Sequence, residues 1–331
     1  MRILVAPDKF KGTASAQTVA EAIRAALSDD HEVITQPLAD GGEGTIEAFG
    51  GSNRTDVVLG PLSSPVSAQW RLHGDTAIIE MAQASGLTLA GGLEDNDPIA
   101  ASTIGTGQLI AIAIERGARN IIVGAGGSAT TDGGLGALEA LYPLERLREI
   151  TITVACDVAT RFVEAAETFG PQKGASPSQV RFLKRRLERV GQIYLEERGV
   201  DVLQMDMAGA AGGLAGGLAS VGASLVNGFN AVSEEVELLD LIENADLVIT
   251  GEGNVDKSSF EGKVVGGVLK LADETKTDAI VIAGNFEKSL PYSAPIYGLQ
   301  DEVGTESAFS QTQKSLENVA KKAVSNWEKG R

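Results

Sequence analysis

The sequence predicts an α/β protein. Short runs of Ile, Val and Leu recur along the chain, each ending in Gly, Asp or Asn, at residues 2–6, 32–38, 120–123, 151–155, 246–250 and 279–283. Near-continuous apolar runs of this length are typical of strands that are covered on both faces in a parallel sheet. Helical patterns separate the runs, and this alternation of strands and helices is the mark of the α/β class.

One pair of runs departs from this pattern. Residues 67–72 and 76–81 are separated only by His73-Gly74-Asp75, a spacing that predicts an antiparallel hairpin. A hairpin beside parallel strands suggests a second subdomain.

The helices are predicted from their caps and their apolar stripes. A serine N-cap or a capping box predicts where a helix begins, and a glycine just past the last turn predicts where it ends. The first expected helix starts after Ser15, and the second runs from Ile104 to Arg116 and stops at Gly117. A third begins at Ser176 through its box with Gln179 and ends near Gly199. Two more are expected from Ser233 toward Ile242 and over residues 305–329.

Charge and composition exclude several classes of protein. The net charge is −17, which argues against nucleic-acid binding and against docking on anionic membranes. A single cysteine, Cys156, rules out a disulfide framework and a CxxC zinc site, and there are only two histidines. No apolar stretch approaches ~18 residues, and the first residues are typical of a strand rather than a signal peptide. We therefore expect a cytoplasmic protein without membrane or nucleic-acid partners.

Glycine is the outlier of the composition, with 40 of 331 residues. The glycines concentrate at residues 41–44, 124–136, 209–217 and 251–267, at or near predicted strand ends and beside carboxylates and lysines. Glycines there let backbone N–H groups approach an anion, carboxylates hold Mg²⁺ or accept a hydroxyl proton, and lysine neutralises a phosphoryl group. This combination favours phosphoryl transfer from a nucleotide.

Each cluster also has a simpler interpretation. Asp8-Lys9-Phe10-Lys11-Gly12 is either the rim of a site or a turn with a solvated charge pair. Asp40-Gly41-Gly42-Glu43-Gly44-Thr45 carries more glycines than a turn needs, which favours function. In Phe169–Gly174, Lys173 lies in a rigid Pro/Gly loop, and Gly251–Asp256 with Lys263 resembles the other strand-end clusters. Residues 209–217 favour close packing of a helix, with Gly209 near a ligand.

Residues 124–129 match G-x-G-x-x-A directly after a predicted strand. The acidic residue that a dinucleotide site needs ~20 positions later is missing, so a dinucleotide site is the second interpretation. Thr130-Thr131-Asp132 follow with hydroxyls and a carboxylate, which suits phosphate and Mg²⁺ better. The chain has no G-x-x-x-x-G-K-[ST] motif, and Ser128 has no histidine in a motif that could activate it.

These clusters resemble the bacterial glycerate kinase type I family. The matching segments occur in the family's order and cover most of the chain: APDKFKG (6–12), LADGGEGT (38–45), IEMAQASGL (79–87), GAGGSATTDGG (124–134), ACDV (155–158), FGPQKGAS (169–176), GAAGGLAGGL (209–218), ITGEGNVD (249–256) and FEGK (260–263).

The resemblance implies ATP-dependent phosphorylation of D-glycerate, usually at the 2-hydroxyl, with Mg²⁺. It also implies two α/β domains with a mainly parallel sheet and the active-site cleft between them. We expect one domain from both chain ends, residues 1–85 and 285–331, and an inserted Gly-rich domain at 86–284. Whether the protein is a monomer or a homodimer stays open.

The chain departs from the family at four places, which bear on substrate preference more than on the reaction class. Lys9 replaces the usual Ser, and Thr131 replaces the usual Asn. The chain is shorter than usual between Tyr142 and Ile150, and Ala159–Phe162 replaces an Asn-Pro-Leu segment.

The predicted site combines both lines of reasoning. Asp8 or Asp132 is expected as the base or the Mg²⁺ ligand, with Glu252 and Asp256 as further metal ligands. Lys11 and Lys173 are expected to neutralise the substrate carboxylate or the transferring phosphoryl group. Substrate and nucleotide binding is assigned to Asp40, Gly41, Gly42, Glu43, Gly126, Gly127, Ser128, Thr131, Asp157, Gly209 and Lys263. Two alternatives stay open: a kinase of another small hydroxy acid or polyol, and a non-catalytic nucleotide or metabolite sensor.

Overall fold

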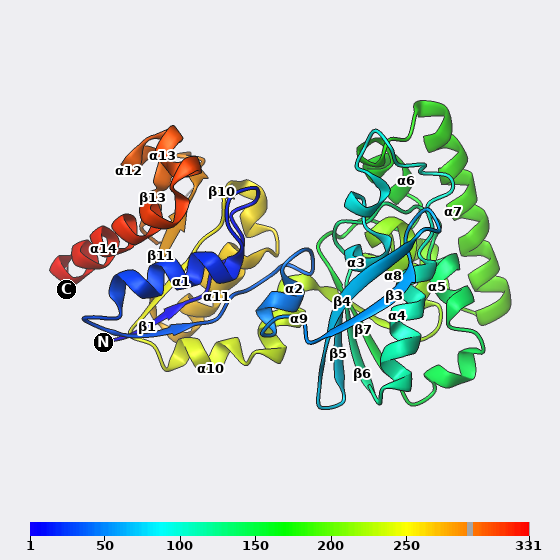
Figure 1. Ribbon diagram of the computed structural model, residues 1–331, viewed down its shortest axis with the longest axis horizontal. Helices are drawn as coiled ribbons and strands as arrows, with labels where there is room; N and C mark the ends of the chain where they lie inside the picture. The colour runs from blue at the N-terminus through cyan, green and yellow to red at the C-terminus, as the bar shows by residue number, and fades with distance from the viewer. Residues whose placement is uncertain (290–293, 331) are drawn as a thin grey trace. The chain divides into compact units, whose positions relative to one another are not determined.

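Two sheets organise residues 1–289 and 294–330, the part of the chain that this computed structural model describes (Figure 1). The chain divides into two compact units, each with its own sheet. Unit 1 combines Met1–Asp40 with Phe229–Arg331, and unit 2 is the continuous segment Gly41–Gly228. The predicted α/β class with mainly parallel strands is confirmed.

The sheet of unit 1 has five parallel strands. Their order is β13 (Ile296–Gly298), β11 (Asp278–Ala283), β9 (Leu247–Thr250), β1 (Arg2–Val5) and β2 (Glu32–Thr35). Alternate residues of β1, β9 and β11 pack against α1 (Ala16–Leu27) and α14 (Thr312–Gly330). Figure 1 shows these two helices, the first and the last of the chain, side by side. The opposite side chains of β11 pack against α11 (Val264–Thr275).

The strand order of unit 1 reverses direction at β1. The chain moves from β1 to its neighbour β2 on one side, and later places β9 on the other side of β1. Open parallel sheets bind ligands at the carboxyl ends of the strands where such a reversal occurs. Asp8 follows β1 and Glu252 follows β9, so both carboxylates lie at this point.

The remaining elements of unit 1 are short. They are α9 (Gly228–Glu235), α10 (Leu238–Glu243), the pair β10 (Asn254–Val255) and β12 (Asn285–Phe286), η6 (Lys257–Phe260), α12 (Leu299–Val303) and α13 (Thr305–Ser310).

The sheet of unit 2 has six strands in sequence order. They are β3 (Arg54–Leu59), β4 (Pro65–His73), β5 (Thr76–Glu80), β6 (Asn120–Gly124), β7 (Thr151–Cys156) and β8 (Ser224–Asn227). The pairs β3–β4 and β4–β5 are antiparallel, and β5 to β8 are parallel. The register pairs Glu80 with Gly124 and Gly124 with Ala155, so these parallel strands end at one edge.

Helices and short turns fill the connections of unit 2. They are α2 (Thr45–Ala48), α3 (Ala82–Ser85), η1 (Thr88–Ala90), α4 (Ile104–Glu115), α5 (Leu135–Ala140), η2 (Leu144–Leu147), α6 (Ala165–Phe169), η3 (Pro171–Lys173), α7 (Pro177–Arg198), η4 (Val202–Gln204), η5 (Ala210–Gly213) and α8 (Leu214–Ala219). Its main core joins Trp70, Ile79, Leu109, Val123 and Leu214, which are fully buried.

Several predicted elements are confirmed. The hairpin is β4–β5, although it belongs to the six-stranded sheet rather than to a subdomain of its own. Ser15 caps α1 by accepting from the Thr18 N–H, and Ser176 with Gln179 forms the predicted capping box of α7. Gly199 ends α7 in the left-handed conformation at φ 70°.

Two helix predictions are wrong. Ser233 does not open a helix, because it lies inside α9; a break at Glu237, whose φ is +50°, separates α9 from α10. The predicted helix at 305–329 is two helices, because Gln311 leaves the helical conformation between α13 and α14. In addition, β3, β8, β13 and the short strands β10 and β12 are not predicted.

The unit boundaries also differ from the predicted domain boundaries at 85/86 and 284/285. Strands β3 to β5 join β6 in one sheet, which places residues 41–85 in unit 2. Strand β9 pairs with β1 and β11, which places residues 229–284 in unit 1. Within the described residues, no helix has the length and apolar character needed to cross a membrane.

Candidate active site

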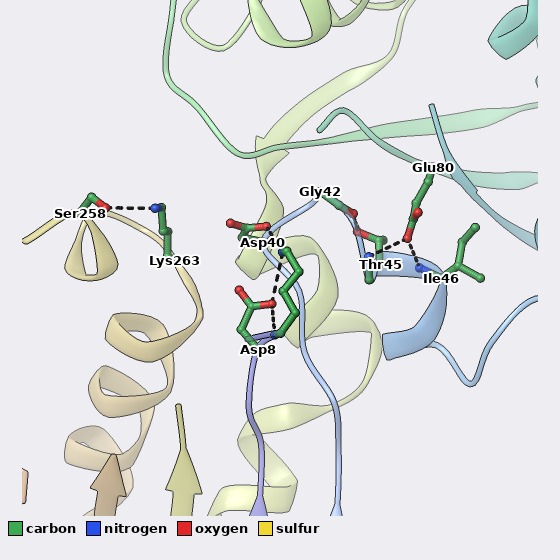
Figure 2. A network of polar contacts seen from close by, with 10 residues as sticks. Asp8, Asp40, Gly42, Thr45, Ile46, Glu80, Ser258 and Lys263 are labelled. Carbon is green, nitrogen blue, oxygen red and sulfur yellow. Dashed lines mark hydrogen bonds and ion pairs between the residues drawn. The ribbon is translucent and has the colours of Figure 1, made fainter. Parts of the chain in front are cut away.

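Three carboxylates gather where strands β1, β2 and β9 end in unit 1. Asp8 is 5% exposed, and its backbone N–H donates to the Gly251 carbonyl at 2.8 Å. Figure 2 shows the side chains of Asp8 and Asp40 close together. The Lys9 ammonium lies 3.4 Å from Asp8 Oδ1 and 3.7 Å from Asp40 Oδ1. These acids repel one another: the negative charge of Asp40 raises the pKa values of both Asp8 and Glu252.

Burial dominates the protonation of this cluster. Desolvation raises the pKa of Asp8 to about 6, against the lowering effect of Lys9. It raises the pKa of Glu252 to about 7, and Asp8 adds to that rise. Glu252 Oε1 is buried without a hydrogen-bond partner within the described chain. The pKa values of both Asp8 and Glu252 are thus moved toward neutrality, as acid–base chemistry requires.

The other predicted residues of unit 1 lie outside this cluster of contacts. Lys11 is exposed at the tip of a turn that the Phe10–Ala14 backbone pair closes, so Lys9 rather than Lys11 meets the carboxylates. Asp256 caps η6 by accepting from the Ser258 N–H, and the hydrogen bonds from the side chain and the backbone of Ser258 lower the pKa of Asp256. Lys263 donates to Ser258 Oγ at 3.0 Å, as Figure 2 shows.

The predicted loop at 41–45 is anchored on the sheet of unit 2. Glu80, the last residue of β5, accepts from the Gly44 N–H at 3.0 Å and the Ile46 N–H at 2.9 Å (Figure 2). Glu80 is 6% exposed, and burial raises its pKa. The backbone of Gly41 also packs closely against Ala155. Its φ is +88°, and a Cβ at this position would lie 2.6 Å from the Ala155 carbonyl oxygen. The loop is therefore held rigidly, with Glu43 exposed.

Lys173 is the central charged group of unit 2. Its ammonium is buried and donates to Ser128 Oγ and to the Thr130 carbonyl, both at 2.7 Å. Desolvation lowers the pKa of Lys173 to about 8, although Asp132 and Asp157 oppose that shift. Within the described residues, no carboxylate forms an ion pair with Lys173 within 4.0 Å. Buried charges are normally paired, so this ammonium is suited to an incoming anion.

Asn96 positions this lysine. Its amide nitrogen donates to the Lys173 carbonyl at 2.8 Å and to the Ala129 carbonyl at 3.2 Å. The side chain thereby joins the lysine turn to the 128–131 loop. Asn96 Oδ1 and Thr131 Oγ1 are both buried without a hydrogen-bond partner within the described residues.

Asp132 does not fit its predicted role as base or metal ligand. Its Oδ2 accepts from Thr103 N and Thr103 Oγ1, both at 2.8 Å, and from Gly136 N at 3.2 Å, while Oδ1 accepts from Gly134 N at 3.0 Å. The side chain is 3% exposed. Most of the acceptor capacity of a carboxylate is thus used inside the fold. Asp132 ties the start of α4 to the 132–136 loop.

The glycines serve chain packing more than the prediction assumed. A Cβ on Gly126 would lie 2.5 Å from the Gly42 Cα, and one on Gly209 would lie 2.3 Å from the Arg161 carbonyl oxygen. Close packing of the 209–217 segment is confirmed, because a Cβ on Gly216 would meet the Phe162 ring at 2.4 Å. In the 126–128 loop, only Gly127 is exposed, at φ +75° beside Ser128.

A metal site made of protein ligands alone is not seen in the described part of the chain. No group of three or more His, Cys, Asp or Glu side chains there is arranged to hold a metal ion. Mg²⁺ is usually held by one or two carboxylates together with substrate phosphates, so a three-ligand cage is not required. The free, buried oxygen of Glu252 fits such a role, and the occupied oxygens of Asp132 and the capping role of Asp256 fit it less well.

Three positioning residues escaped the sequence analysis. Glu80 had one signal, since a carboxylate ends an otherwise apolar strand. Asn96 and Thr103 lie in a loop and at a helix start without any pattern that marks them. Their partners are far away along the chain, so only the folded structure reveals their contacts.

Unit 1 thus has buried carboxylates at the carboxyl ends of its parallel strands, and unit 2 has a buried lysine beside the loop that follows β6. Each feature is typical of α/β enzymes that act on anionic substrates. The comparisons then identify the family. A model of the Glycerate kinase family matches residues 3–142 and 143–328. The two matches meet at Tyr142 and Pro143, at the start of the segment that is expected from the sequence to be shortened.

Individual relatives agree with this match. Glycerate 2-kinase of Escherichia coli K12 is 38% identical, with 94% of this chain and 90% of that protein covered. Glycerate kinase of Bacillus subtilis 168 is 36% identical, with 87% and 86% covered. The crystal structure of a candidate glycerate kinase 2 from Salmonella typhimurium LT2 superposes with a TM-score of 0.83 at 34% identity and covers 99% of both chains. The protein belongs to the glycerate kinase family and is a kinase.

Proposed function

We propose that the protein transfers the γ-phosphoryl group of ATP to the 2-hydroxyl of D-glycerate, with Mg²⁺. Family membership and the names of the relatives support glycerate as the acceptor. The name of the E. coli relative, glycerate 2-kinase, supports the 2-hydroxyl.

The observation that carries this proposal is the buried ammonium of Lys173. It has two neutral acceptors and no carboxylate partner within ion-pair distance in the described chain. Both substrates bring negative groups, the carboxylate of glycerate and the phosphates of ATP. An anion beside Lys173 would compensate the buried charge, and it would do so in a place from which water is largely excluded, where the attraction is strong.

Asp8 is our proposed general base. Its pKa of about 6 leaves the carboxylate mostly ionised at neutral pH, yet basic enough to accept the proton of a hydroxyl group as phosphoryl transfer proceeds. Both contacts from Lys9 go to Oδ1. No hydrogen bond to Oδ2 forms within the described residues, so Oδ2 is the oxygen that can receive the proton.

The remaining predicted residues keep supporting roles in this proposal. Mg²⁺ would neutralise phosphate charge when bound, and Glu252 is the carboxylate that would hold it. Gly127 and Ser128 would contact phosphate, since Gly127 is exposed and Ser128 already orients the Lys173 ammonium. Exposed Lys11, Glu43 and Asp157, together with Asp40, Gly41, Gly42, Thr131 and Lys263, remain candidates for substrate or nucleotide binding.

The test is direct measurement of ADP release over a panel of small hydroxy acids and polyols, followed by NMR of the product. We expect turnover with D-glycerate and a phosphorus–proton coupling at C2. Lys173→Met should reduce kcat/KM by about 10²-fold or more, because it removes a desolvated charge partner of the anion. Lys184→Met, which removes a lysine from the exposed face of α7, is the matched control.

Each outcome decides one part of the proposal. Turnover only with another acceptor would show that glycerate is not the substrate. Coupling at C3 would show that the 3-hydroxyl, not the 2-hydroxyl, is phosphorylated. The absence of ADP release with every acceptor would favour a sensor. Full activity of Lys173→Met would show that the buried ammonium does not bind the anionic substrate.

A further inference from the structure

Lys9 is placed differently from an ordinary surface lysine. Its side chain is only 20% exposed, and its ammonium lies between Asp8 and Asp40 at 3.4 and 3.7 Å. Its backbone N–H also donates to Asp8 Oδ1, at 2.7 Å. One residue therefore contacts the same carboxylate oxygen from its backbone and from its side chain.

This arrangement makes the two oxygens of Asp8 unequal. Oδ1 accepts from Lys9 twice, whereas Oδ2 accepts no hydrogen bond within the described residues. The backbone of Asp8 is fixed as well, by its N–H bond to Gly251. A carboxylate held through one oxygen has a defined rotation about Cβ–Cγ, and its other oxygen points in a defined direction.

The charge of Lys9 has a second effect. Asp8 is buried beside two other carboxylates, Asp40 and Glu252, and repulsion between these acids would turn the Asp8 side chain away or favour its neutral form. A cation that bridges Asp8 and Asp40 offsets this repulsion. Replacing it with an uncharged side chain would leave the acids of the cluster facing one another.

We infer that Lys9 is the positioning residue of Asp8: it bridges the Asp8 and Asp40 carboxylates and directs Asp8 Oδ2 toward the hydroxyl that is phosphorylated. This inference rests on the proposed function, because it takes Asp8 as the base. Lys9 itself acts through Asp8 and takes no proton from the substrate.

A double-mutant comparison tests whether Lys9 acts through Asp8. Lys9→Met should lower kcat by about 10- to 100-fold with little change in the KM for glycerate, since general-base catalysis is worth about 10²–10⁴-fold. Asp8→Asn should lower kcat further. Adding Lys9→Met to Asp8→Asn should change kcat by less than about twofold, because residues that act as one unit are not additive.

A chemical rescue separates positioning from damage to the fold. The Lys9→Cys variant can be alkylated with 2-bromoethylamine, which restores an ammonium at the lysine position, or with iodoacetamide, which adds a neutral amide. The native Cys156 should stay unmodified, since it is 1% exposed and burial raises the pKa of its thiol to about 12. We expect aminoethylation to recover at least about tenfold in kcat and carbamoylmethylation to recover none. Wild-type protein treated with each reagent is the control.

The possible results are distinct. Wild-type kcat in Lys9→Met, equal recovery with both reagents, or an undiminished effect of Lys9→Met in the Asp8→Asn background would each overturn the role of Lys9. If Asp8→Asn keeps wild-type kcat, the proposed base fails instead. If the wild type does not phosphorylate glycerate, the proposed function fails before Lys9 is tested.

Discussion

At the scale of single residues, the structure separates groups that the sequence treats alike. Asp8 and Asp132 are both carboxylates after predicted strands, and either fits a base or a metal ligand by sequence. In the fold, Asp132 is enclosed by four hydrogen bonds from backbone and hydroxyl donors, while Asp8 has one oxygen without a partner in the described chain. Hydrogen-bond capacity, which depends on neighbours that are distant in sequence, therefore favours Asp8.

The buried charge of Asp8 predicts a gain in stability when it is removed. The pKa of Asp8 is higher in the fold than its usual 3.8, so ionisation costs the folded state free energy above about pH 6. Asp8→Asn should raise the free energy of unfolding at pH 7.5 by about 1–2 kcal/mol while activity is lost. Urea unfolding measures this change.

The raised pKa of Asp8 also predicts how the stability gain of Asp8→Asn depends on pH. The gain should be full above pH 6 and should disappear as the pH falls toward 4, because the wild-type carboxyl then binds its proton in the fold. Asp30→Asn removes the same charge from an exposed position and should change stability little. A loss of stability in Asp8→Asn at pH 7.5 would show that its contacts with Lys9 outweigh its desolvation.

Asp8 and Lys173 together predict a bell-shaped dependence of activity on pH. Protonation of Asp8 near pH 6 removes the base, and deprotonation of Lys173 near pH 8 removes the cation that attracts the anion. Direct quantification of ADP from pH 5 to 9 measures both limbs. Lys173→Arg, whose guanidinium stays charged, should shift the alkaline limb upward in the activity that remains. A flat profile between pH 5 and 6 would exclude Asp8 as the base.

At the scale of elements, local signals predicted the helices that have strong caps. Ser15 and Ser176 begin helices and Gly199 ends one, as expected, because capping bonds form between residues a few positions apart. Strand β3 was not predicted, since it is an edge strand in which half of the residues are exposed and only Val58 is buried. The break at Gln311 also lacks a Gly or Pro signal. Elements that depend on neighbours from elsewhere in the fold are the ones that local patterns miss.

The loop at 41–45 offers a test at this scale. Glu80 accepts two backbone N–H groups at the start of α2, and no other residue of β5 reaches them. Glu80→Ala should leave those donors unpaired, loosen the loop and reduce kcat/KM by about tenfold. Hydrogen exchange at the Gly44 and Ile46 amides measures the loosening directly.

Glu80→Gln is the matched variant, because its amide oxygen can still accept both bonds. It should keep slow exchange at both amides and most of the activity. Slow exchange in Glu80→Ala would show that Glu80 does not hold the loop.

At the scale of the whole molecule, the two units differ in how the chain forms them. Unit 2 is one continuous segment with its own sheet and core, whereas unit 1 joins two separate segments through the β1–β9 and α1–α14 contacts. A continuous unit with a complete core can fold alone.

We therefore predict that residues 41–228, expressed alone, unfold cooperatively in urea. Trp70, which is fully buried, is the tryptophan of this segment and reports its unfolding by fluorescence. Residues 229–331 without residues 1–40 lack both β1, which pairs with β9, and β2, which pairs with β1, and they should not fold. A broad, non-cooperative transition of the 41–228 segment would show that unit 2 needs unit 1.

The sequence by itself determined the α/β class, the strand ends that carry the chemistry, and the family. Apolar periodicity, capping residues and motifs act over short stretches, so they can be read directly from the residues. Tertiary structure alone decided the unit boundaries, the choice of Lys9 over Lys11 at the carboxylates, and the enclosure of Asp132. The physical reason is that strand pairing, burial and hydrogen-bond satisfaction join residues up to 244 positions apart, as in the bond from Thr250 to Ala6.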